Sequence, residues 1–487
     1  MSTLLQEKSV VIPKRSGYNG SRNQTVWGIH LFFAHTGMKE GRYTLSGKVT
    51  ATANPVLDKP IFYEFFTGFT YRRCTLVQTK TDALTFRIGN APLPTPNDAE
   101  YAIYVGAEGA AVCAKTEQGL LHGCLTLLDL IGIDADGTVY LPYCELQERP
   151  LVRLRMVHFC VFPETELWEI QKFLRLAAAL KYTHVVLEFW GMLRYSCMAE
   201  LAWRQAYTPA QIRPLVQEAR DLGLEIVPMF NHFGHAAAGR VMHGKHVVLD
   251  QNPALAYLFD ENGWCWNYRS ERVRNLLGQI RGELCDLYGA GAYFHIGCDE
   301  AYSFTEADAP AFCHYVNETA AELQTIGRRA IMWGDMMLSP REEWSGYSAN
   351  APSKACERVM RQTLSKEILV ADWQYEVKTY PIQTALSLQE DGFSVLCCPW
   401  DRSNACVDAN LRTVKEHALA GVLHTTWHTL SGGMPYVGRV AAKCWEGGTL
   451  SRDNAWVQLA ALLRKVQFVN GDFERAGWAK QEIGVIV

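Results

Sequence analysis

The feature that most constrains the fold is a repetition of strand and helix that begins after Arg149-Pro150. Short apolar runs alternate there with helical stretches, which is typical of parallel strands joined by helical crossovers. The expected strands are residues 155–162, 184–189, 225–230, 292–298, 329–332, 368–372, 394–398 and 421–426. Eight such strands favour a closed (β/α)8 barrel. An open doubly wound sheet is the alternative, although it more often has a glycine-rich first turn, and the chain contains no GxGxxG.

Residues 1–148 have a different pattern, with short strand-like runs separated by turns rich in Gly, Pro and Asn. Apolar residues at helical spacing predict one helix from about Glu117 onward. At 487 residues the chain is longer than one ordinary domain. We therefore expect a small α/β accessory domain over residues 1–148 and a barrel with C-terminal helices over residues 149–487.

Composition excludes several classes of partner. A formal net charge of −4 provides no basic excess for nucleic acid or acidic membranes, and we expect no membrane span. The first 16 residues lack an apolar core of signal-peptide length, and the 15 cysteines are dispersed without CxxC spacing. We expect reduced thiols, a cytoplasmic location and no metal or other cofactor. The oligomeric state is open, and a homodimer is one of the states considered.

The apolar run over residues 292–298 ends in two adjacent carboxylates, Asp299 and Glu300. Charges at the end of a buried strand are costly unless they are used, and the carboxyl ends of barrel strands display catalytic groups. Neighbouring carboxylates also disfavour joint ionisation, which suits one of them to act as an acid. The pair is the expected catalytic centre.

Polar and aromatic residues follow the other strands in a consistent way. His235 comes shortly after the third strand, where its imidazole would reach Glu300. Tryptophan ends five of the eight strands, and recurrence at equivalent positions predicts a shared concave pocket. Aromatic walls, a few polar groups and an acid pair indicate a sugar site. The expected substrate-binding residues at these strand ends are Glu188, Asn231, Trp333, Trp373, Tyr375, Trp400, Asp401 and Trp427.

The run His295-Ile296-Gly297-Cys298-Asp299-Glu300 resembles the His-x-Gly-Gly-Asp-Glu signature of glycoside hydrolase family 20, the β-N-acetylhexosaminidases. Residues 228–235 are similar to the family's Pro-Glu-x-Asp-x-Pro-Gly-His segment. Arg155 falls where the first barrel strand of the family carries a sugar-binding arginine. Trp333, Trp373 and Trp427 match the tryptophans that enclose the acetamido group.

Other positions depart from the family pattern. Asn231 stands where the family often has Asp, and the Trp-x-Glu expected after the eighth strand is Trp427-His428-Thr429. The tyrosine usual near the seventh strand has no clear match. Glu188, Gly234-His235 and the Gly-Cys-Asp-Glu form resemble the hexosaminidase D branch, which implies a cytoplasmic enzyme with a tendency toward galactosamine substrates.

The resemblance implies an exo-acting, retaining β-N-acetylhexosaminidase that cleaves terminal N-acetylgalactosamine or N-acetylglucosamine by substrate-assisted catalysis. Glu300 would be the acid and base, and Asp299 would hold the acetamido group. One alternative is an ordinary retaining glycosidase with Asp335 or Asp401 as its nucleophile. Another is a catalytically idle carbohydrate-binding barrel.

Overall fold

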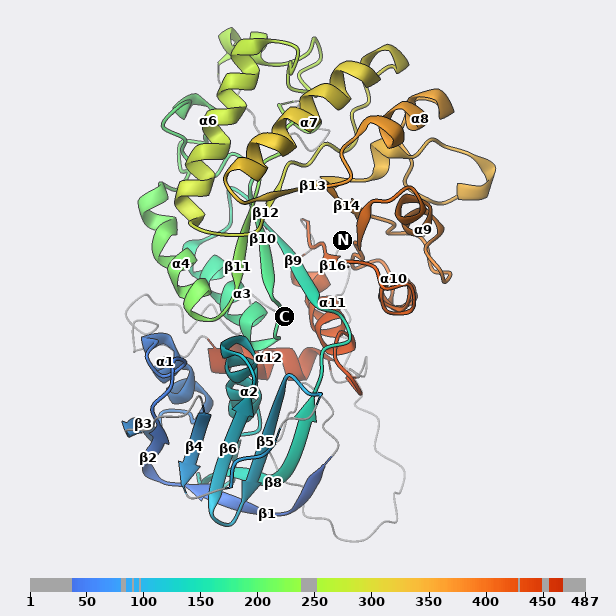
Figure 1. Ribbon diagram of the computed structural model, residues 1–487. Coiled ribbons are helices and arrows are strands. Elements are labelled where there is room, and N and C mark those ends of the chain that lie inside the picture. The colour runs from blue at the N-terminus through green and yellow to red at the C-terminus, as the bar shows by residue number, and fades with distance from the viewer. Residues whose placement is uncertain are drawn as a thin grey trace, which may run out of the picture.

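The computed structural model describes residues 37–79, 85–89, 92–95, 98–237, 252–427, 430–448 and 455–466. Figure 1 shows a mixed sheet at one end of the molecule and a helix-wrapped barrel at the other. The chain passes from sheet to barrel between Glu148 and Leu154. This change of architecture supports the division at residues 148 and 149, which we keep as a proposal.

The N-terminal sheet has the strand order β1-β8-β5-β6-β4-β2-β3, and β7 pairs with β8. Its pairings are antiparallel except for β2 with β3. The strands are β1 (Met38–Leu45), β2 (Gly47–Thr52), β3 (Cys74–Thr79), β4 (Thr85–Gly89), β5 (Tyr101–Gly106), β6 (Gly109–Ala114), β7 (Gly132–Ile133) and β8 (Val139–Glu148). Helices α1 (Pro60–Phe69) and α2 (Glu117–Asp129) lie between this sheet and the barrel, because α1 contacts α12 (Ala455–Val466) and α2 contacts α3 (Leu167–Ala179).

The second part is a closed barrel of eight parallel strands, so the barrel prediction is confirmed. All eight strands fall on the expected segments. They are β9 (Leu154–Val161), β10 (His184–Phe189), β11 (Glu225–Met229), β12 (Tyr293–His295), β13 (Arg329–Trp333), β14 (Leu369–Asp372), β15 (Ser394–Cys397) and β16 (Gly421–His424). The strand β12 ends earlier than expected because Gly297 and Cys298 have φ values of 69° and 73°, which are incompatible with a strand.

Helices connect and cover the strands, and local sequence explains where they begin. Thr208 caps α4 in a reciprocal bond with Gln211, and Pro209 occupies the first turn, where its missing N–H is harmless. The remaining bounds are α3 (Leu167–Ala179), α4 (Pro209–Asp221), α6 (Glu271–Tyr288), α7 (Ala309–Thr325), α8 (Lys354–Thr363), α9 (Gln383–Glu390), α10 (Asn404–Glu416), α11 (Leu430–Lys443) and α12 (Ala455–Val466).

The apolar side chains that fill the barrel lumen come from seven of the strands. The short β12 adds Tyr293 at the margin and the buried His295, whose ring centroid lies 4.3 Å from that of Trp333. The buried apolar side chains of the lumen include Met156, Val186, Val227, Leu369 and Leu423. Burying one such side chain stabilises the fold by about 1.5–3 kcal/mol. The tryptophans expected at the site, Trp333, Trp373 and Trp427, belong to the same cluster, so this packed layer supports the mouth of the barrel.

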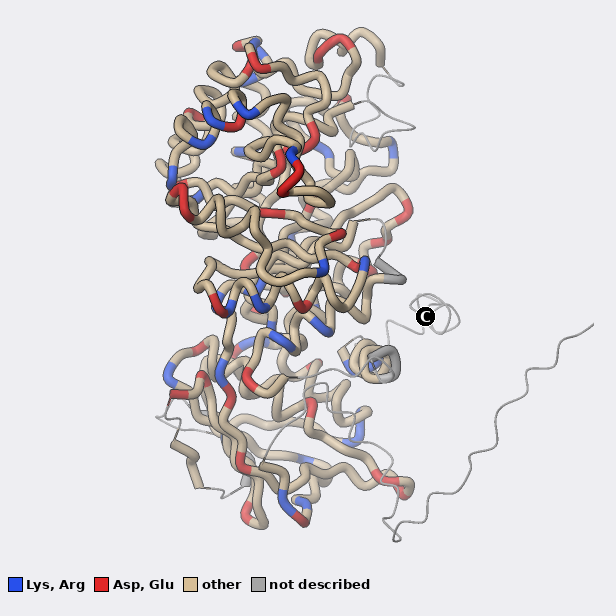
Figure 2. The backbone as a smooth tube through the Cα atoms, turned by 90° about the vertical axis from the view of Figure 1, so that its right-hand side faces the viewer, with Lys and Arg blue, Asp and Glu red and all other residues tan. Residues whose placement is uncertain are grey.

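Charged residues are interspersed over both parts of the chain, and Figure 2 shows blue and red positions alternating without a continuous basic stripe in that view. Among the helices that the structure describes, none has the length and apolarity that crossing a bilayer requires. All 15 cysteines are free thiols.

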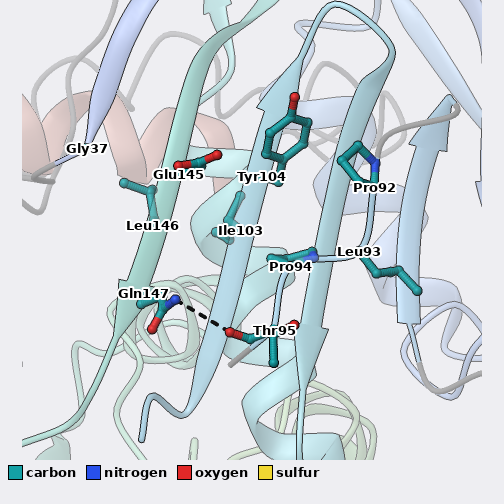
Figure 3. Close-up of a pocket in the computed structure, with 10 residues that line it drawn as sticks. All are labelled: Gly37, Pro92, Leu93, Pro94, Thr95, Ile103, Tyr104, Glu145, Leu146 and Gln147. Atoms are coloured by element: carbon teal, nitrogen blue, oxygen red, sulfur yellow. Dashed lines mark hydrogen bonds between the residues drawn. The ribbon is translucent and has the colours of Figure 1, made fainter. Parts of the chain in front are cut away.

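A cavity of about 730 Å³ lies on the N-terminal sheet, away from the barrel mouth (Figure 3). Ile103, Tyr104 and Leu146 contribute to its lining, and residues 92–95 form one side. The side chain of Gln147 donates a hydrogen bond to the carbonyl of Thr95 across it. Glu145 is its one acidic lining residue, so this cavity contains no group of side chains that could perform acid–base chemistry.

Candidate active site

The carboxylates Asp299 and Glu300 follow β12 at the carboxyl end of the barrel. Asp299 is nearly buried, whereas the Glu300 side chain is 27% exposed and faces accessible space. Glu300 has a φ of 46°, a left-handed conformation that an L-residue adopts only when its surroundings enforce it. Backbone strain is thus stored at the acid pair.

His235 contacts both carboxylates. Its Nε2 lies 3.0 Å from Glu300 Oε2 and 3.4 Å from Asp299 Oδ2. The residue itself has a φ of 54°, and Trp264 packs against its ring with centroids 4.6 Å apart. The Trp264 indole also donates a hydrogen bond of 2.5 Å to the carbonyl of Glu300. These contacts fix the imidazole between the two acids.

Asn231 orients Asp299. Its amide nitrogen donates to Asp299 Oδ1 at 2.6 Å, and its amide oxygen accepts from the N–H of Cys298 at 3.0 Å. The neighbouring turn depends on Gly234, because a Cβ at that position would lie 2.2 Å from the carbonyl oxygen of Asp299. The loop after β11 therefore fits closely against the acid pair only with glycine there.

Five aromatic side chains, Trp333, Trp373, Tyr375, Trp400 and Trp427, form what we call the aromatic wall. Trp333 and Trp427 have ring centroids 5.8 Å apart, and Tyr375 lies 5.1 Å from both Trp373 and Trp400. The Trp427 indole donates to the Tyr375 hydroxyl at 2.8 Å, which links its two halves. Trp427 has a φ of 42°, another strained position.

Asp335 joins the acid pair to the aromatic wall. Its Oδ2 accepts from the backbone N–H of Glu300 at 3.0 Å and from Asn350 at 2.9 Å. Its Oδ1 accepts from the Trp373 indole at 3.1 Å. Burial and the nearby Asp299 carboxylate raise the pKa of Asp335 to about 7. The arrangement is a carboxylate cluster beside the aromatic wall, which suits acid–base chemistry on a sugar.

Residues 183–403 match the family model described as Glycosyl hydrolase family 20, catalytic domain. The matched segment holds both carboxylates, His235, Asn231 and Asp335. This segment, which spans most of the barrel, is similar to the catalytic domain of glycosyl hydrolase family 20.

Known proteins similar to this chain are distant in sequence. A β-hexosaminidase of Porphyromonas gingivalis is 21% identical over 282 residues, covering 49% of this chain and 36% of the relative. Hexosaminidase D of Bos taurus is 26% identical over 136 residues, covering 27% of this chain and 36% of the relative. The chain thus spans about a third of the length of each of these curated relatives.

Solved structures agree with the fold. The family 20 β-N-acetylhexosaminidase of Streptomyces coelicolor A3(2) superposes with a TM-score of 0.65 at 17% identity, covering 91% of this chain and 97% of that one. An exo-β-N-acetylglucosaminidase of Vibrio harveyi gives 0.65 at 14% identity, with 93% and 80% covered.

One predicted site residue lies elsewhere. Arg155 is near the amino end of β9, and its guanidinium donates to the carbonyls of Lys181 and Val152, both at 2.9 Å. Trp445 packs on it at 4.8 Å. The side chain therefore points toward the N-terminal domain, away from the carboxyl ends of the strands. The prediction that Arg155 binds sugar is wrong, because a residue early in a strand is displayed at the opposite end of the barrel.

Glu188 is fully buried at the end of β10. Its Oε2 lies 3.2 Å from His158 Nε2 and accepts from the Trp190 indole at 3.1 Å. His158 in turn meets Trp427 with ring centroids 4.6 Å apart, so Glu188 backs the aromatic wall. Asp401 packs against Gly433 of α11, and His428 and Thr429 lie outside the described residues.

Among the described residues, His158, Cys160 and Glu188 form the group most similar to a metal site. The Cys160 sulfur lies 3.5 Å from His158 Nε2 and 3.9 Å from Nδ1, so it sits over the imidazole rather than ahead of the Nε2 lone pair. An ion shared by Nε2 and the sulfur in tetrahedral geometry would place the sulfur about 5 Å or more from Nδ1. The cluster therefore fits a hydrogen-bonded pair with a thiol packed against it.

Sequence reasoning missed several members of the site. The sequence places Asp335 at the barrel mouth but does not predict its hydrogen bonds with the Glu300 backbone and the Trp373 indole. Trp264 and Asn350 come from long connections without periodicity, where no pattern predicts contacts. His158 is in the first strand, and only its alternation with inward-facing neighbours could have indicated it.

Proposed function

We propose that the chain is an exo-acting, retaining β-N-acetylhexosaminidase that works by substrate-assisted catalysis. The observation that carries this proposal is the Asp299–Glu300 pair, with His235 Nε2 within 3.4 Å of both side chains and the aromatic wall beside it. The family assignment supports the reaction class. No cofactor enters the proposed chemistry.

In the first step Glu300 protonates the glycosidic oxygen as the bond from the anomeric carbon to that oxygen breaks. The acetamido oxygen of the substrate attacks the same carbon and closes an oxazolinium ring. Asp299, ionised, accepts a hydrogen bond from the acetamido N–H and balances the positive charge that develops. In the second step water attacks the anomeric carbon, Glu300 takes its proton, and the acetamido group is restored.

His235 and Asn231 give the two carboxylates different tasks. Asn231 holds Asp299 Oδ1 at 2.6 Å, which leaves the other oxygen toward His235. The 3.0 Å contact with His235 orients Glu300 Oε2. Since catalysis requires an acid aimed at the leaving oxygen and a base aimed at the acetamido group, this division fits the reaction.

The aromatic wall would enclose the acetamido methyl group. Trp333, Trp373 and Trp427 share one cluster in the barrel. The Trp373 indole donates a hydrogen bond to Asp335, which also accepts one from the backbone N–H of Glu300. Burying a methyl group contributes only about 1 kcal/mol, so the larger benefit is a fixed direction for the attacking oxygen.

We propose terminal N-acetylgalactosamine and N-acetylglucosamine as the substrates, and Tyr375, Trp400 and Asp401 as further sugar-binding residues. The buried Glu188 supports the aromatic wall from behind. The related Vibrio harveyi protein is named for the glucosaminide. We also propose a cytoplasmic location, which the 15 free thiols support.

The observed contacts favour neither an ordinary retaining glycosidase nor a catalytically idle carbohydrate-binding barrel. A nucleophilic Asp335 would have to be ionised and free to reach the sugar, yet three donors hold its oxygens and its pKa is raised to about 7. An idle binding barrel would not need an exposed Glu300 beside a buried imidazole.

The test is an assay with aryl β-N-acetylglucosaminide and β-N-acetylgalactosaminide on wild type and Glu300→Gln. A general acid contributes about 10² to 10⁴ in rate, so kcat should fall by that factor while binding persists. Glu318→Gln, on the exposed surface of α7, is the matched control. Near wild-type turnover of Glu300→Gln, or no hydrolysis by wild type, would refute the proposal.

A further inference from the structure

Asp335 occupies a central place that the proposed reaction does not yet use. It begins the short helical turn Asp335–Met337 directly after β13 and is 1% exposed. Two separate parts of the site end on its carboxylate. The Glu300 backbone and Asn350 are bonded to Oδ2, and the Trp373 indole is bonded to Oδ1.

Each of these partners is a donor, so the carboxylate accepts three hydrogen bonds. Hydrogen bonds from fixed donors hold a carboxylate, and the carboxylate holds the donors in return. Glu300 needs such support because its φ of 46° is strained. Trp373 needs it because an indole whose N–H is unbound can turn away from the pocket.

We propose that Asp335 is a positioning residue that holds the acid–base residue Glu300 and the pocket-wall residue Trp373 in one rigid unit. The inference rests on the proposed function. It assigns to one side chain the alignment of two events, proton delivery to the leaving group and enclosure of the acetamido group. Asp335 itself touches neither sugar nor leaving group in this scheme.

The charge of Asp335 adds a second effect. The titratable groups that face it are Asp299 and Glu300, with Cys298 and Tyr302 on the same loop, and His235 faces the acid pair from the β11 side. A third negative charge here opposes loss of a proton from the site. Since burial raises the pKa of Asp335 to about 7, this charge appears as the pH passes through neutrality.

The decisive variant is Asp335→Asn, which keeps the shape but replaces one acceptor oxygen with a donor. One of the two partners, the Glu300 backbone or the Trp373 indole, then loses its acceptor. We expect kcat/KM to fall about ten- to a hundredfold, the range for a hydrogen bond to a charged group. The loss should be larger for an alkyl leaving group, which needs the acid, than for a dinitrophenyl group.

Asp372→Asn is the matched control. Asp372 is also a buried carboxyl with its pKa raised by burial, to about 6, but it is bonded to Thr384 and Gln374. Its variant should retain the wild-type pH profile and leaving-group dependence, whatever happens to its thermal stability. Equal changes in the two variants would assign Asp335 a structural role only and overturn the inference.

The pH profile of kcat/KM gives a signed readout. Wild type should show an inflection near pH 7 that Asp335→Asn lacks. In Asn350→Ala the inflection should move to higher pH, because removing a donor from the ionised carboxyl raises the pKa of Asp335. A profile unchanged by either variant would contradict the assignment.

Trp373→Phe keeps an aromatic ring but removes the donor, so it tests the coupling. If Asp335 holds Trp373 in place, the double variant Asp335→Asn/Trp373→Phe should lose less kcat/KM than the product of the two single fold-losses. Independent, multiplicative losses would contradict one rigid unit. A wild type inactive on every aryl N-acetylhexosaminide would instead refute the proposed function.

In that case thermal denaturation against pH still tests the buried carboxyl. The folded state keeps a proton on Asp335 up to about pH 7, whereas the unfolded chain loses it near its ordinary pKa. Stability should therefore fall as the pH rises from 4 to 7, and less steeply in Asp335→Asn. Identical slopes of stability against pH in wild type and Asp335→Asn would contradict a buried Asp335 carboxyl with a raised pKa, on which the inference depends.

Discussion

His235 Nε2 lies 3.0 Å from Glu300 Oε2, and the same nitrogen is 3.4 Å from Asp299 Oδ2. One imidazole nitrogen therefore serves both carboxylates. Because a ring nitrogen can donate only one hydrogen, the contact to one acid weakens when the other is engaged. Proton movement on Glu300 is in this way coupled to the orientation of Asp299.

His235→Asn should lower kcat by about a hundredfold with a smaller change in KM, since aligned proton transfer contributes about 10² to 10⁴ in rate. His184→Asn is the control, because His184 lies at the amino end of β10 and pairs with Glu225. Steady-state kinetics on an aryl N-acetylhexosaminide measures both. A change confined to KM would mean that His235 only binds substrate.

Asn231→Asp replaces the donor that meets Asp299 Oδ1 at 2.6 Å with a second carboxylate. Two carboxylates at this separation cannot both ionise, so Asp299 would lose either its charge or its orientation. Loss of a hydrogen bond to a charged group costs about 1.5–3 kcal/mol, which is roughly ten- to a hundredfold in kcat/KM. Activity equal to wild type would show that Asn231 does not orient Asp299.

Asp299→Asn should reduce turnover mainly for substrates that carry an N-acyl group, because its proposed partner is the acetamido N–H. The comparison is between an aryl N-acetylglucosaminide and the corresponding plain glucoside, each as a ratio to wild type. Proportional losses on the two substrates would favour the ordinary two-carboxylate scheme.

The strands of the barrel could be predicted because parallel strands buried on both faces are read from short apolar runs. The acid pair could be placed because it interrupts such a run, and the structure confirms the barrel around it. Apolar periodicity alone marks the end of β12 imperfectly, since the left-handed residues Gly297 and Cys298 set that boundary.

Contacts between loops could not be predicted from the sequence. The approach of Trp264 to Glu300, and of Asn350 to Asp335, joins residues separated by 36 and 15 positions in segments without periodicity. The prediction that Arg155 binds sugar was wrong for a different reason. A strand has two ends, and sequence similarity does not show toward which end a long side chain points. Direction along the strand decides the role of such a residue.

The last prediction concerns the choice between sugars that differ at O4. Discrimination there requires a buried polar group that is left unpaired by the wrong epimer. The acid expected after β16 is absent, since the sequence reads Trp427-His428-Thr429. Two nearby carboxylates that could replace it are already engaged, Asp335 by three donors and Glu188 Oε2 by the indole of Trp190.

With weaker contacts at the non-reducing hydroxyls, N-acetylgalactosaminides should be cleaved at least comparably to N-acetylglucosaminides. The measurement is kcat/KM on the two aryl glycosides, with Asp401→Asn beside wild type because Asp401 is the remaining candidate acceptor. A glucosaminide preference above about a hundredfold, roughly 2.7 kcal/mol in transition-state binding, would defeat the prediction. If that preference then disappeared in Asp401→Asn, Asp401 would be identified as the acceptor. Only a residue that pairs with one of the two epimers changes the preference when it is removed.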